Sequence, residues 1–133
     1  MTKYCLSIVR GLKRNNGLTK PKTDINNILK KEKFVEIKQL IYKTRQEKIF
    51  SVKNDVSRLI NKFKSNDVLL VNYPTDMGYL FDRTLLNKLR SKQVKSIAFI
   101  HDIDALRFQM PFYKSLKHEI TLLNKYKRDS FLI

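Results

Sequence analysis

Apolar runs and amphipathic helical patterns alternate along the whole chain, and this alternation limits the fold more than any other feature. Residues with helical spacing follow each of four apolar segments, which are 4–9, 35–42, 67–74 and 95–102. The helical pattern is clearest from Val52 to Phe63, where apolar residues recur every three or four positions with Lys or Arg opposite. Strands that alternate with helices pair in parallel through right-handed crossovers. The sequence therefore predicts an α/β fold, a doubly wound parallel sheet with helices on both faces.

The two ends of this pattern bear on domain organisation. Residues 130–133 (SFLI) resemble the opening of a fifth strand that follows a predicted helix over 112–127. With 133 residues, 42% of them hydrophobic, the chain can form one core of ordinary size, so we expect a single domain over 1–133. The run 35–42 alternates apolar and polar residues, which is typical of an edge strand. A sheet of four or five strands can stand alone or form the amino-terminal half of a longer protein, and both interpretations stay open here.

The charge of the chain indicates an anionic partner. There are 28 Lys and Arg residues against 12 Asp and Glu residues, a formal net charge of +16. This excess is more than solubility requires, and nucleic acid, anionic lipid headgroups and phosphate-bearing substrates all suit it. Many of the basic residues fall toward the carboxyl ends of the predicted helices, where cations favour the helix dipole. No known nucleic-acid-binding sequence signature accompanies them.

The single cysteine and the absence of long apolar runs indicate in which cellular compartment the protein lies. Cys5 lies in an apolar strand and cannot form an internal disulfide, so we interpret it as a small buried hydrophobe. No uncharged apolar run reaches the length of about 18 residues that a membrane-spanning helix needs. The first apolar run is too short for the core of a signal peptide. We therefore expect a cytoplasmic protein. Peripheral binding to the inner face of the plasma membrane stays open as an addition to this location.

Titratable residues follow the fourth predicted strand, in the segment SIAFIHDIDALRF at 96–108. Open α/β sheets bind their ligands at the carboxyl ends of the strands. His101 at such a position can act as a general base or donate a hydrogen bond to a sugar hydroxyl, and Asp102 or Asp104 could fix its tautomer. A purely structural polar cap is the alternative. Metal binding is not favoured, because the only other histidine, His118, lies in a helical surface pattern.

Two turns of the predicted sheet lie at the same edge as that segment. The turn 10–24 holds two of the three glycines and can receive a phosphate on its backbone N–H groups, although its spacing matches no known phosphate-binding motif. A flexible basic turn without a ligand explains the composition of this segment equally well. The turn 72–79 (NYPTDMGY) contains Pro and Gly, and the backbone geometry of a turn is sufficient to explain both residues without a binding role. If the third and fourth strands are parallel neighbours, we expect Asn72 and Tyr73 to point into one crevice with His101.

Three stretches, in this order, resemble a known family. They are NNGLTKPKTDINNILKKEKFVEI at 15–37, DVLLVNYPTDMGYLFDRTLLNKLRSKQVKSIAFIHDIDALRF at 67–108, and LLNKYK at 122–127. The chain resembles the amino-terminal domain of a bacterial sugar-transferase family. That family includes β-1,6-galactofuranosyltransferases and the glucosyltransferases that extend glycans on serine-rich adhesins. The most telling part is the strand that ends in residues 101–103, with the NYPT turn before it.

The resemblance implies a GT-B architecture, in which two Rossmann-like domains face each other across a cleft. The carboxyl-terminal domain would hold most of a nucleotide-sugar donor such as a UDP-sugar, with no other cofactor. The amino-terminal domain would contact the acceptor, which would be a saccharide, a lipid-linked saccharide or a glycoprotein. This chain would then be the Rossmann-like acceptor-side domain of a glycosyltransferase that transfers a hexosyl or galactofuranosyl group.

The resemblance also implies a set of site residues at strand ends and in the turns that follow them. They are Asn16, Gly17, Thr19, Tyr73, Pro74, Thr75, His101, Asp102, Asp104 and Arg107. The first three would lie near the phosphates or sugar of the donor, and the next three would line the acceptor side. His101 and Asp102 would stand beside the reacting sugar, with His101 as the base, and the last two would bind substrate.

The chain departs from the family after residues 124–126. The family continues there as a strand into the donor-binding domain, whereas this sequence ends with KRDSFLI. We therefore expect the chain to be inactive alone and to need a donor-binding domain or subunit, and apolar surface at the docking face predicts self-association. The alternative function is a non-enzymatic basic module that binds nucleic acid or another polyanion. A flavodoxin-like regulatory domain is a third interpretation, but the usual acidic cluster at its strand ends is missing.

Overall fold

A computed structural model describes residues 1–9, 20–101, 112–126 and 131–132 of the chain. Within these residues, strands and helices alternate as the sequence predicts. The strands are β1 (Lys3–Val9), β2 (Val35–Leu40), β3 (Val68–Tyr73), β4 (Lys95–Ile100) and β5 (Phe131–Leu132). The helices are α1 (Lys20–Lys31), α2 (Arg45–Ile60), α3 (Tyr79–Ser91) and α5 (Phe112–Leu123). The predicted fifth strand is present in its central residues.

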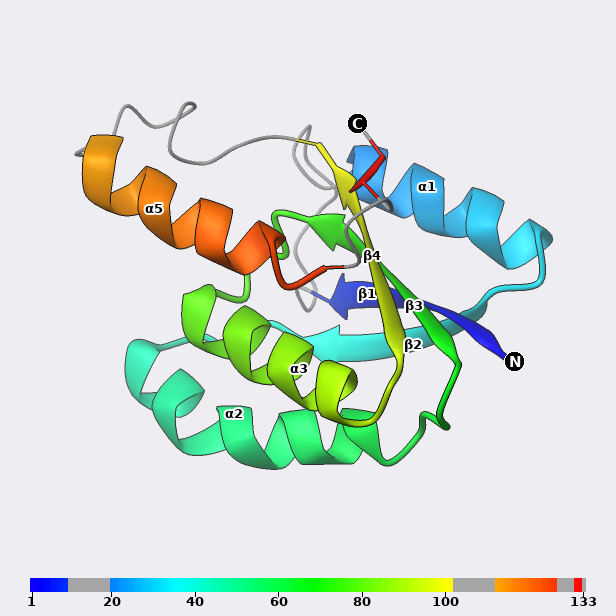
Figure 1. The fold of residues 1–133 in the computed structure, drawn as a ribbon, viewed down its shortest axis with the longest axis horizontal. Helices are drawn as coiled ribbons and strands as arrows, with labels where there is room; N and C mark the ends of the chain where they lie inside the picture. Colours follow the sequence, from blue (N-terminus) through cyan, green and yellow to red (C-terminus); the bar gives the residue numbers. More distant parts are fainter. Residues whose placement is uncertain (10–19, 102–111, 127–130, 133) are drawn as a thin grey trace.

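The strands form one parallel sheet in the order β2-β1-β3-β4-β5. Figure 1 shows α1 on one side of the sheet and α2 and α3 side by side on the other, with α5 next to α3. After β1 the chain moves one strand to one side, and every later strand is added on the opposite side. This arrangement confirms the predicted Rossmann-like doubly wound sheet. It also places a reversal of strand order between β1 and β3.

Burial follows the position of each strand in the sheet. All six residues of β3 are buried, as expected of a central strand covered by helices on both faces. In β2 only Ile37 and Gln39 are buried and their neighbours are more exposed, which confirms an edge strand. This strand ends at Leu40, two residues before its predicted end, because the chain then turns toward α2. The Thr44 side chain caps that helix by accepting a hydrogen bond of 3.0 Å from the Glu47 backbone N–H.

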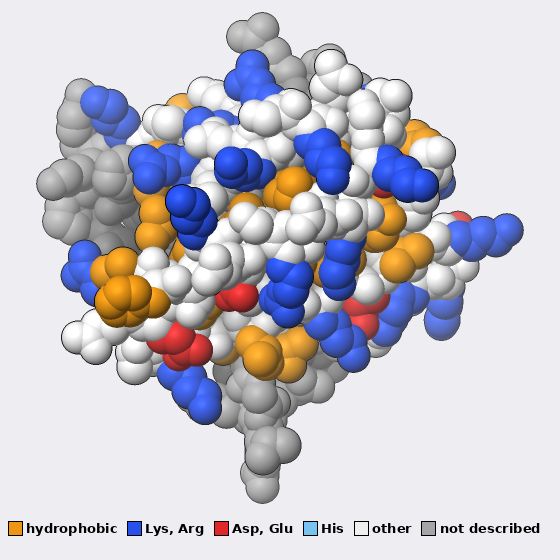
Figure 2. All heavy atoms as spheres, turned by 90° about the horizontal axis from the view of Figure 1, so that it is seen from below, with side chains coloured by type: hydrophobic (Ala, Val, Ile, Leu, Met, Phe, Trp, Pro, Cys, Tyr) orange, Lys and Arg blue, Asp and Glu red, His pale blue; other side chains and the backbone are white. Residues whose placement is uncertain are grey.

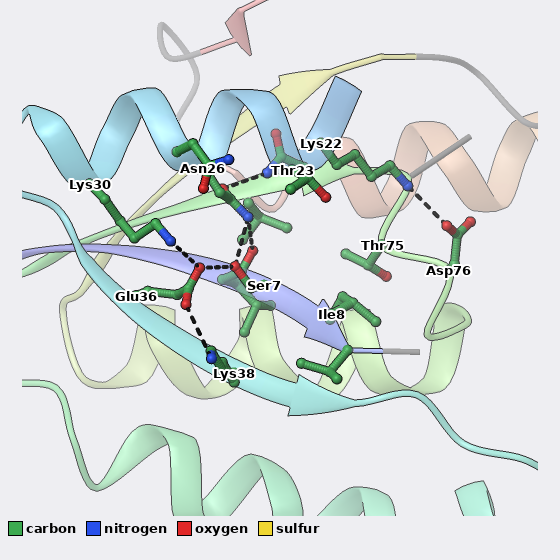
Figure 3. A pocket seen from close by; sticks show the side chains of 15 residues that line it. Ser7, Ile8, Lys22, Thr23, Asn26, Lys30, Glu36, Lys38, Thr75 and Asp76 are labelled. Atoms are coloured by element: carbon green, nitrogen blue, oxygen red, sulfur yellow. Dashed lines mark hydrogen bonds and ion pairs between the residues drawn. The ribbon is translucent and has the colours of Figure 1, made fainter. Parts of the chain in front are cut away.

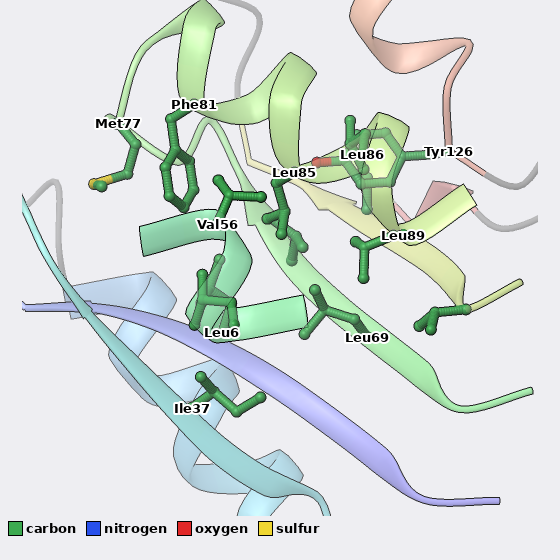
Figure 4. Packing of buried hydrophobic residues seen from close by; sticks show 14 of the residues in the cluster. Leu6, Ile37, Val56, Leu69, Met77, Phe81, Leu85, Leu86, Leu89 and Tyr126 are labelled. Atoms are coloured by element: carbon green, nitrogen blue, oxygen red, sulfur yellow. The ribbon is translucent and has the colours of Figure 1, made fainter. Parts of the chain in front are cut away.

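The main hydrophobic core lies between the sheet and the helices α2, α3 and α5. Figure 4 shows side chains from the strands, such as Leu6 and Leu69, packed against Val56 of α2 and Phe81 and Leu85 of α3. Each of these five side chains is at most 3% exposed. The residues that alternate with these core positions in β1 and β3, such as Ser7 and Asn72, point to the other face of the sheet, where the described part of the chain contributes helix α1. None of the helices that the structure describes is both long and apolar enough to cross a membrane.

Candidate functional site

A pocket of about 290 Å³ lies between α1 and the carboxyl-terminal halves of β1 and β3 (Figure 3). It therefore lies where the strand order reverses, which is the usual position of the ligand site in a doubly wound sheet. Polar side chains make up much of its lining, and they are Ser7, Lys22, Thr23, Asn26, Asn27, Lys30, Glu36, Lys38, Asn72, Thr75 and Asp76. Such a lining suits a ligand that exchanges many hydrogen bonds.

His101 adjoins this pocket through Asn72, which lines it. The backbone N–H of His101 donates to the Tyr73 carbonyl at 2.8 Å, so the residue continues the pairing of β4 with β3. Its Nε2 atom lies 2.9 Å from Asn72 Oδ1. Burial lowers the pKa of His101, and the positive charge of Lys22 lowers it further. The imidazole is therefore neutral near pH 7 and able to accept a proton.

A row of hydrogen bonds continues from Asn72 across the α1 side of the sheet. Asn72 Nδ2 donates to Asn26 Oδ1 at 2.9 Å, and Asn26 Nδ2 donates to Ser7 Oγ at 2.8 Å. Ser7 Oγ donates in turn to Glu36 Oε2 at 2.9 Å. Asn26 and Asn72 are only 5% and 4% exposed, so their amide groups are held by protein partners rather than by bulk water. The row thus fixes the wall of the pocket.

Lysine side chains give the pocket its charge. Lys30 Nζ lies 3.5 Å from Glu36 Oε2 and Lys38 Nζ lies 3.8 Å from Glu36 Oε1, so this carboxylate is shared between two cations. The Ser7 hydroxyl and Lys30 lower the pKa of Glu36 against the opposing effect of burial. Lys22 Nζ lies 2.9 Å from Asp76 Oδ2 and also donates to the Pro74 carbonyl. Three lysines and two carboxylates leave the lining cationic, which suits a ligand with negative charge or with many acceptor oxygens.

A buried carboxylate lies behind Thr75, the residue that brings the turn after β3 to the pocket. The Thr75 hydroxyl donates to Asp82 Oδ1 at 2.6 Å and accepts a hydrogen bond of 3.2 Å from the Met77 backbone N–H. Burial raises the pKa of Asp82 to about 7. Asp82 is therefore partly protonated near neutral pH, and Thr75 ties this group to the pocket wall.

Comparisons with known proteins identify the family of the chain. A family described as "Glucosyltransferase 3-like, N-terminal domain" matches residues 3–127, which is nearly the whole chain. The chain belongs to this glucosyltransferase 3-like family. It is also 27% identical over 90 residues to "Glucosyltransferase 3" from Streptococcus gordonii. That match covers 68% of this chain and 27% of the streptococcal protein, so the chain spans about a quarter of the length of this relative.

The family membership confirms the coarser part of the sequence interpretation, a glycosyltransferase-related amino-terminal domain. Several predicted site residues lie outside the residues that the structure describes, and they are Asn16, Gly17, Thr19, Asp102, Asp104 and Arg107. Of the remainder, the structure brings His101 next to Asn72 and places Thr75 in the pocket lining. Pro74 is buried and contributes its carbonyl oxygen to Lys22.

Tyr73 does not share a crevice with Asn72, and this corrects the expectation stated for that pair. Successive residues of a strand point to opposite faces of the sheet. Asn72 points to the α1 side, whereas Tyr73 is 3% exposed and belongs to the core beneath α3 and α5. The Tyr73 hydroxyl donates to Glu119 Oε2 of α5 at 2.7 Å. In this glucosyltransferase 3-like domain Tyr73 therefore connects the sheet to a helix.

The sequence interpretation missed the residues that complete the pocket wall, namely Ser7, Asn26 and Glu36. One signal was available, since Ser7 is a polar interruption in the apolar run of β1 on the face that carries Cys5. Asn26 gave no comparable signal, because the rotation of a helix about its axis depends on packing. Glu36 looked like an ordinary outward residue of an edge strand.

Another hollow of this family member offers a less suitable site than the pocket under α1. The hollow lies between β2 and α2, and an ion pair and hydrogen bonds among Tyr42, Asp55, Arg58 and Gln39 fill its wall. Within the described ranges, no group of three or more His, Cys, Asp or Glu residues could hold a metal ion. The pocket under α1 is thus the candidate site.

Proposed function

We propose that this chain is the acceptor-side domain of a GT-B glycosyltransferase. The enzyme would move a sugar from a nucleotide-sugar donor, such as a UDP-sugar, to a saccharide, lipid-linked or glycoprotein acceptor. The observation that supports this most directly is a polar pocket at the reversal of strand order, in a chain of the glucosyltransferase 3-like family. Hydroxyl and amide side chains such as Thr23 and Asn27 suit the hydroxyl groups of a sugar.

In the proposed reaction His101 acts as the general base. An acceptor hydroxyl loses its proton to the neutral imidazole while its oxygen bonds to the anomeric carbon of the donor sugar. The bond from that carbon to the donor phosphate breaks, and the nucleotide leaves with the electron pair. A donor-binding domain or subunit would hold the nucleotide, and the chain without it would be inactive. We place the enzyme in the cytoplasm, where nucleotide sugars are available.

Acceptor binding is tested by titrating ¹⁵N-labelled chain with neutral oligosaccharides and recording amide chemical shifts. We expect shifts that concentrate at Ser7, Asn26 and Asn72. Asn27 is exposed and lines the pocket, so Asn27→Ala should weaken binding several-fold without unfolding the domain. Asn54→Ala, at an exposed position of α2 on the other side of the sheet, is the matched control and should bind like the parent. Equal affinities in both variants would contradict the proposed site.

The catalytic role is tested in a protein that joins this domain to a donor-binding domain. Removal of a general base typically costs about 10²–10⁴-fold in rate, so His101→Ala should reduce turnover by that order. Unchanged turnover with His101→Ala would exclude His101 as the base. It would leave the saccharide-binding result standing.

A second candidate function rests on the surface of α2, α3 and the turns beside them. Figure 2 looks onto this side of the molecule and shows Lys and Arg side chains spread over it, with few acidic ones between. The exposed basic residues of these segments are Lys43, Arg45, Lys53, Arg58, Lys62, Lys64, Arg83, Lys88 and Arg90. Phe50, which is 81% exposed, and Ile49, which is 58% exposed, lie on the same helix as several of them. Such a surface suits an anionic polymer or membrane.

Measuring how the chain binds a nucleic acid and anionic vesicles at different salt concentrations distinguishes these two kinds of partner. Preference for a random oligonucleotide, with affinity that falls steeply as salt rises, would support the polyanion-binding module. Preference for vesicles that contain phosphatidylglycerol would instead support a peripheral membrane position for the transferase. Sedimentation at high protein concentration tests the expected self-association in the same samples.

A further inference from the structure

The hydrogen-bond row beside the pocket has a direction that decides the protonation state of each ring nitrogen of His101. The row joins five side chains, which are His101 directly after β4, Asn72 of β3, Asn26 of α1, Ser7 of β1 and Glu36 of β2. Each link measures 2.8 or 2.9 Å. An amide side chain has a donor end and an acceptor end, so fixing one amide fixes the next.

Glu36, at one end of the row, determines which group donates and which accepts in each hydrogen bond. Its carboxylate is ionised at neutral pH and only accepts hydrogen bonds, so the single hydroxyl proton of Ser7 must point to it. Ser7 Oγ is then left with lone pairs toward α1. The group of Asn26 that faces Ser7 must accordingly be the NH₂ group.

The Leu6 carbonyl sets the same direction independently. It lies 3.3 Å from Asn26 Nδ2, and a carbonyl oxygen can only accept a hydrogen bond. Two acceptors therefore hold the NH₂ group of Asn26 in place, and its Oδ1 faces Asn72. Asn72 must present its NH₂ group to Asn26, and its Oδ1 to the histidine ring.

We propose that Asn72 and Asn26 are positioning residues that hold His101 as the Nε2–H tautomer and so leave Nδ1 as the atom that takes up a proton. Asn72 Oδ1 can only accept, so Nε2 must carry the hydrogen of this contact. The neutral ring has one N–H, and Nδ1 has no hydrogen-bond partner in the described part of the chain. In this proposal Asn72 fixes the tautomer, a role that the sequence analysis considered for Asp102 or Asp104; those two residues lie outside the described part of the chain. The use of Nδ1 as a base rests on the proposed function, whereas the tautomer does not.

The tautomer is measured directly from the ¹⁵N and ¹³C chemical shifts of histidine-labelled protein at about pH 8, above the usual histidine pKa of about 6.5. We expect the shifts of a single Nε2–H tautomer for His101. Averaged shifts, or an Nδ1–H tautomer, in the unmodified protein would overturn the proposal without any variant.

Two variants at neighbouring links test whether amide orientation is the cause. Asn26→Leu removes the group that orients Asn72, so we expect averaged His101 shifts. Ser7→Ala is the matched control. It removes one partner of Asn26 but leaves the Leu6 carbonyl, so the single tautomer should persist. Unchanged His101 shifts in a folded Asn26→Leu protein would overturn the role of Asn26.

These outcomes are separate from those that test the proposed function. A single Nε2–H tautomer together with unchanged turnover of His101→Ala would refute the catalytic role and keep the positioning role. Averaged shifts together with saccharide binding at the pocket would refute the positioning role and keep the proposed acceptor-side domain.

Discussion

Thr75 Oγ1 and Asp82 Oδ1 lie 2.6 Å apart, and this contact joins a pocket residue to a buried carboxyl group on the first turn of α3. Asp82 is 6% exposed, and burial is the largest cause of its raised pKa. The nearby carboxylate of Asp76 raises that pKa further, while the Thr75 hydroxyl opposes the shift. A buried acid of this kind makes the stability of the domain depend on pH near neutrality.

We predict that Asp82→Asn removes part of this pH dependence. The pKa of Asp82 is about 7 in the folded chain and near 3.8 when unfolded, so between these values the folded state binds more protons. The stability that depends on this proton is complete below the unfolded value and is lost as the pH rises through about 7. Relative to the variant, the wild type should lose roughly 1.4 kcal/mol per pH unit within this window.

Urea denaturation at a series of pH values measures this difference. Asn54→Ala, at an exposed position of α2, replaces a side chain that does not titrate; it is the control and should change stability by a similar amount at each pH in the window. Parallel pH profiles for Asp82→Asn and the wild type would show that Asp82 is ionised in the folded state.

The contact between Tyr73 and Glu119 predicts a loss of stability without a loss of binding. Tyr73→Phe keeps the buried ring but removes a hydroxyl that donates to a carboxylate, a change that typically costs about 1.5–3 kcal/mol. Saccharide-induced shifts at the pocket should be unchanged, because this side chain lies on the other face of the sheet. Tyr4→Phe, whose hydroxyl makes an exposed contact of 3.3 Å with the Lys62 carbonyl, should cost much less. Weaker saccharide binding by Tyr73→Phe would instead support an acceptor-side role for Tyr73.

Gly78 is predicted to resist substitution mainly because of its backbone conformation. Its φ of 90° is a conformation that other residues adopt only with strain. A Cβ at this position would also collide with Lys48 Nζ, but this atom ends a flexible side chain that can move aside at little cost. Gly78→Ala should therefore destabilise the domain by at least about 1 kcal/mol. In a Lys48→Ala background the collision disappears but the backbone strain stays, so only part of the loss should be recovered. Thermal melts of both single variants and the double variant measure the two parts, and full recovery would mean that the backbone is unstrained.

Lys22 is predicted to influence the titration of His101. Its positive charge is the second cause of the lowered pKa of His101, after burial. Lys22→Met should therefore raise that pKa, yet leave it below the ordinary value of 6.5. Because a lowered histidine pKa contributes stability that is lost as the pH falls, the variant should also lose less stability on acidification. An NMR titration of the His101 ring measures the shift, and Lys30→Met, whose ion pair is with Glu36, is the control.

Part of the candidate site was predictable from sequence because strand ends in a parallel sheet meet at one edge. His101 follows β4 and Asn72 lies near the end of β3, and the two were expected to be close on that basis alone. The opposite direction of Tyr73 follows from the alternation of side chains along a strand, which the sequence interpretation did not apply at this position. Ser7, Asn26 and Glu36 could not be joined to them, since their meeting depends on strand register and on the rotation of α1.

The sequence by itself determined the class of fold, the edge position of β2 and the edge of the sheet at which polar groups gather. These properties depend on the local period of apolar residues and on the order of segments along the chain. Only the tertiary structure decided which polar groups face one another and in which direction each hydrogen bond runs. Glu36 and His101 are 65 positions apart in sequence, and the packing of α1 on the sheet brings Asn26 between them to complete the row. Such contacts arise from long-range packing, to which no local pattern corresponds.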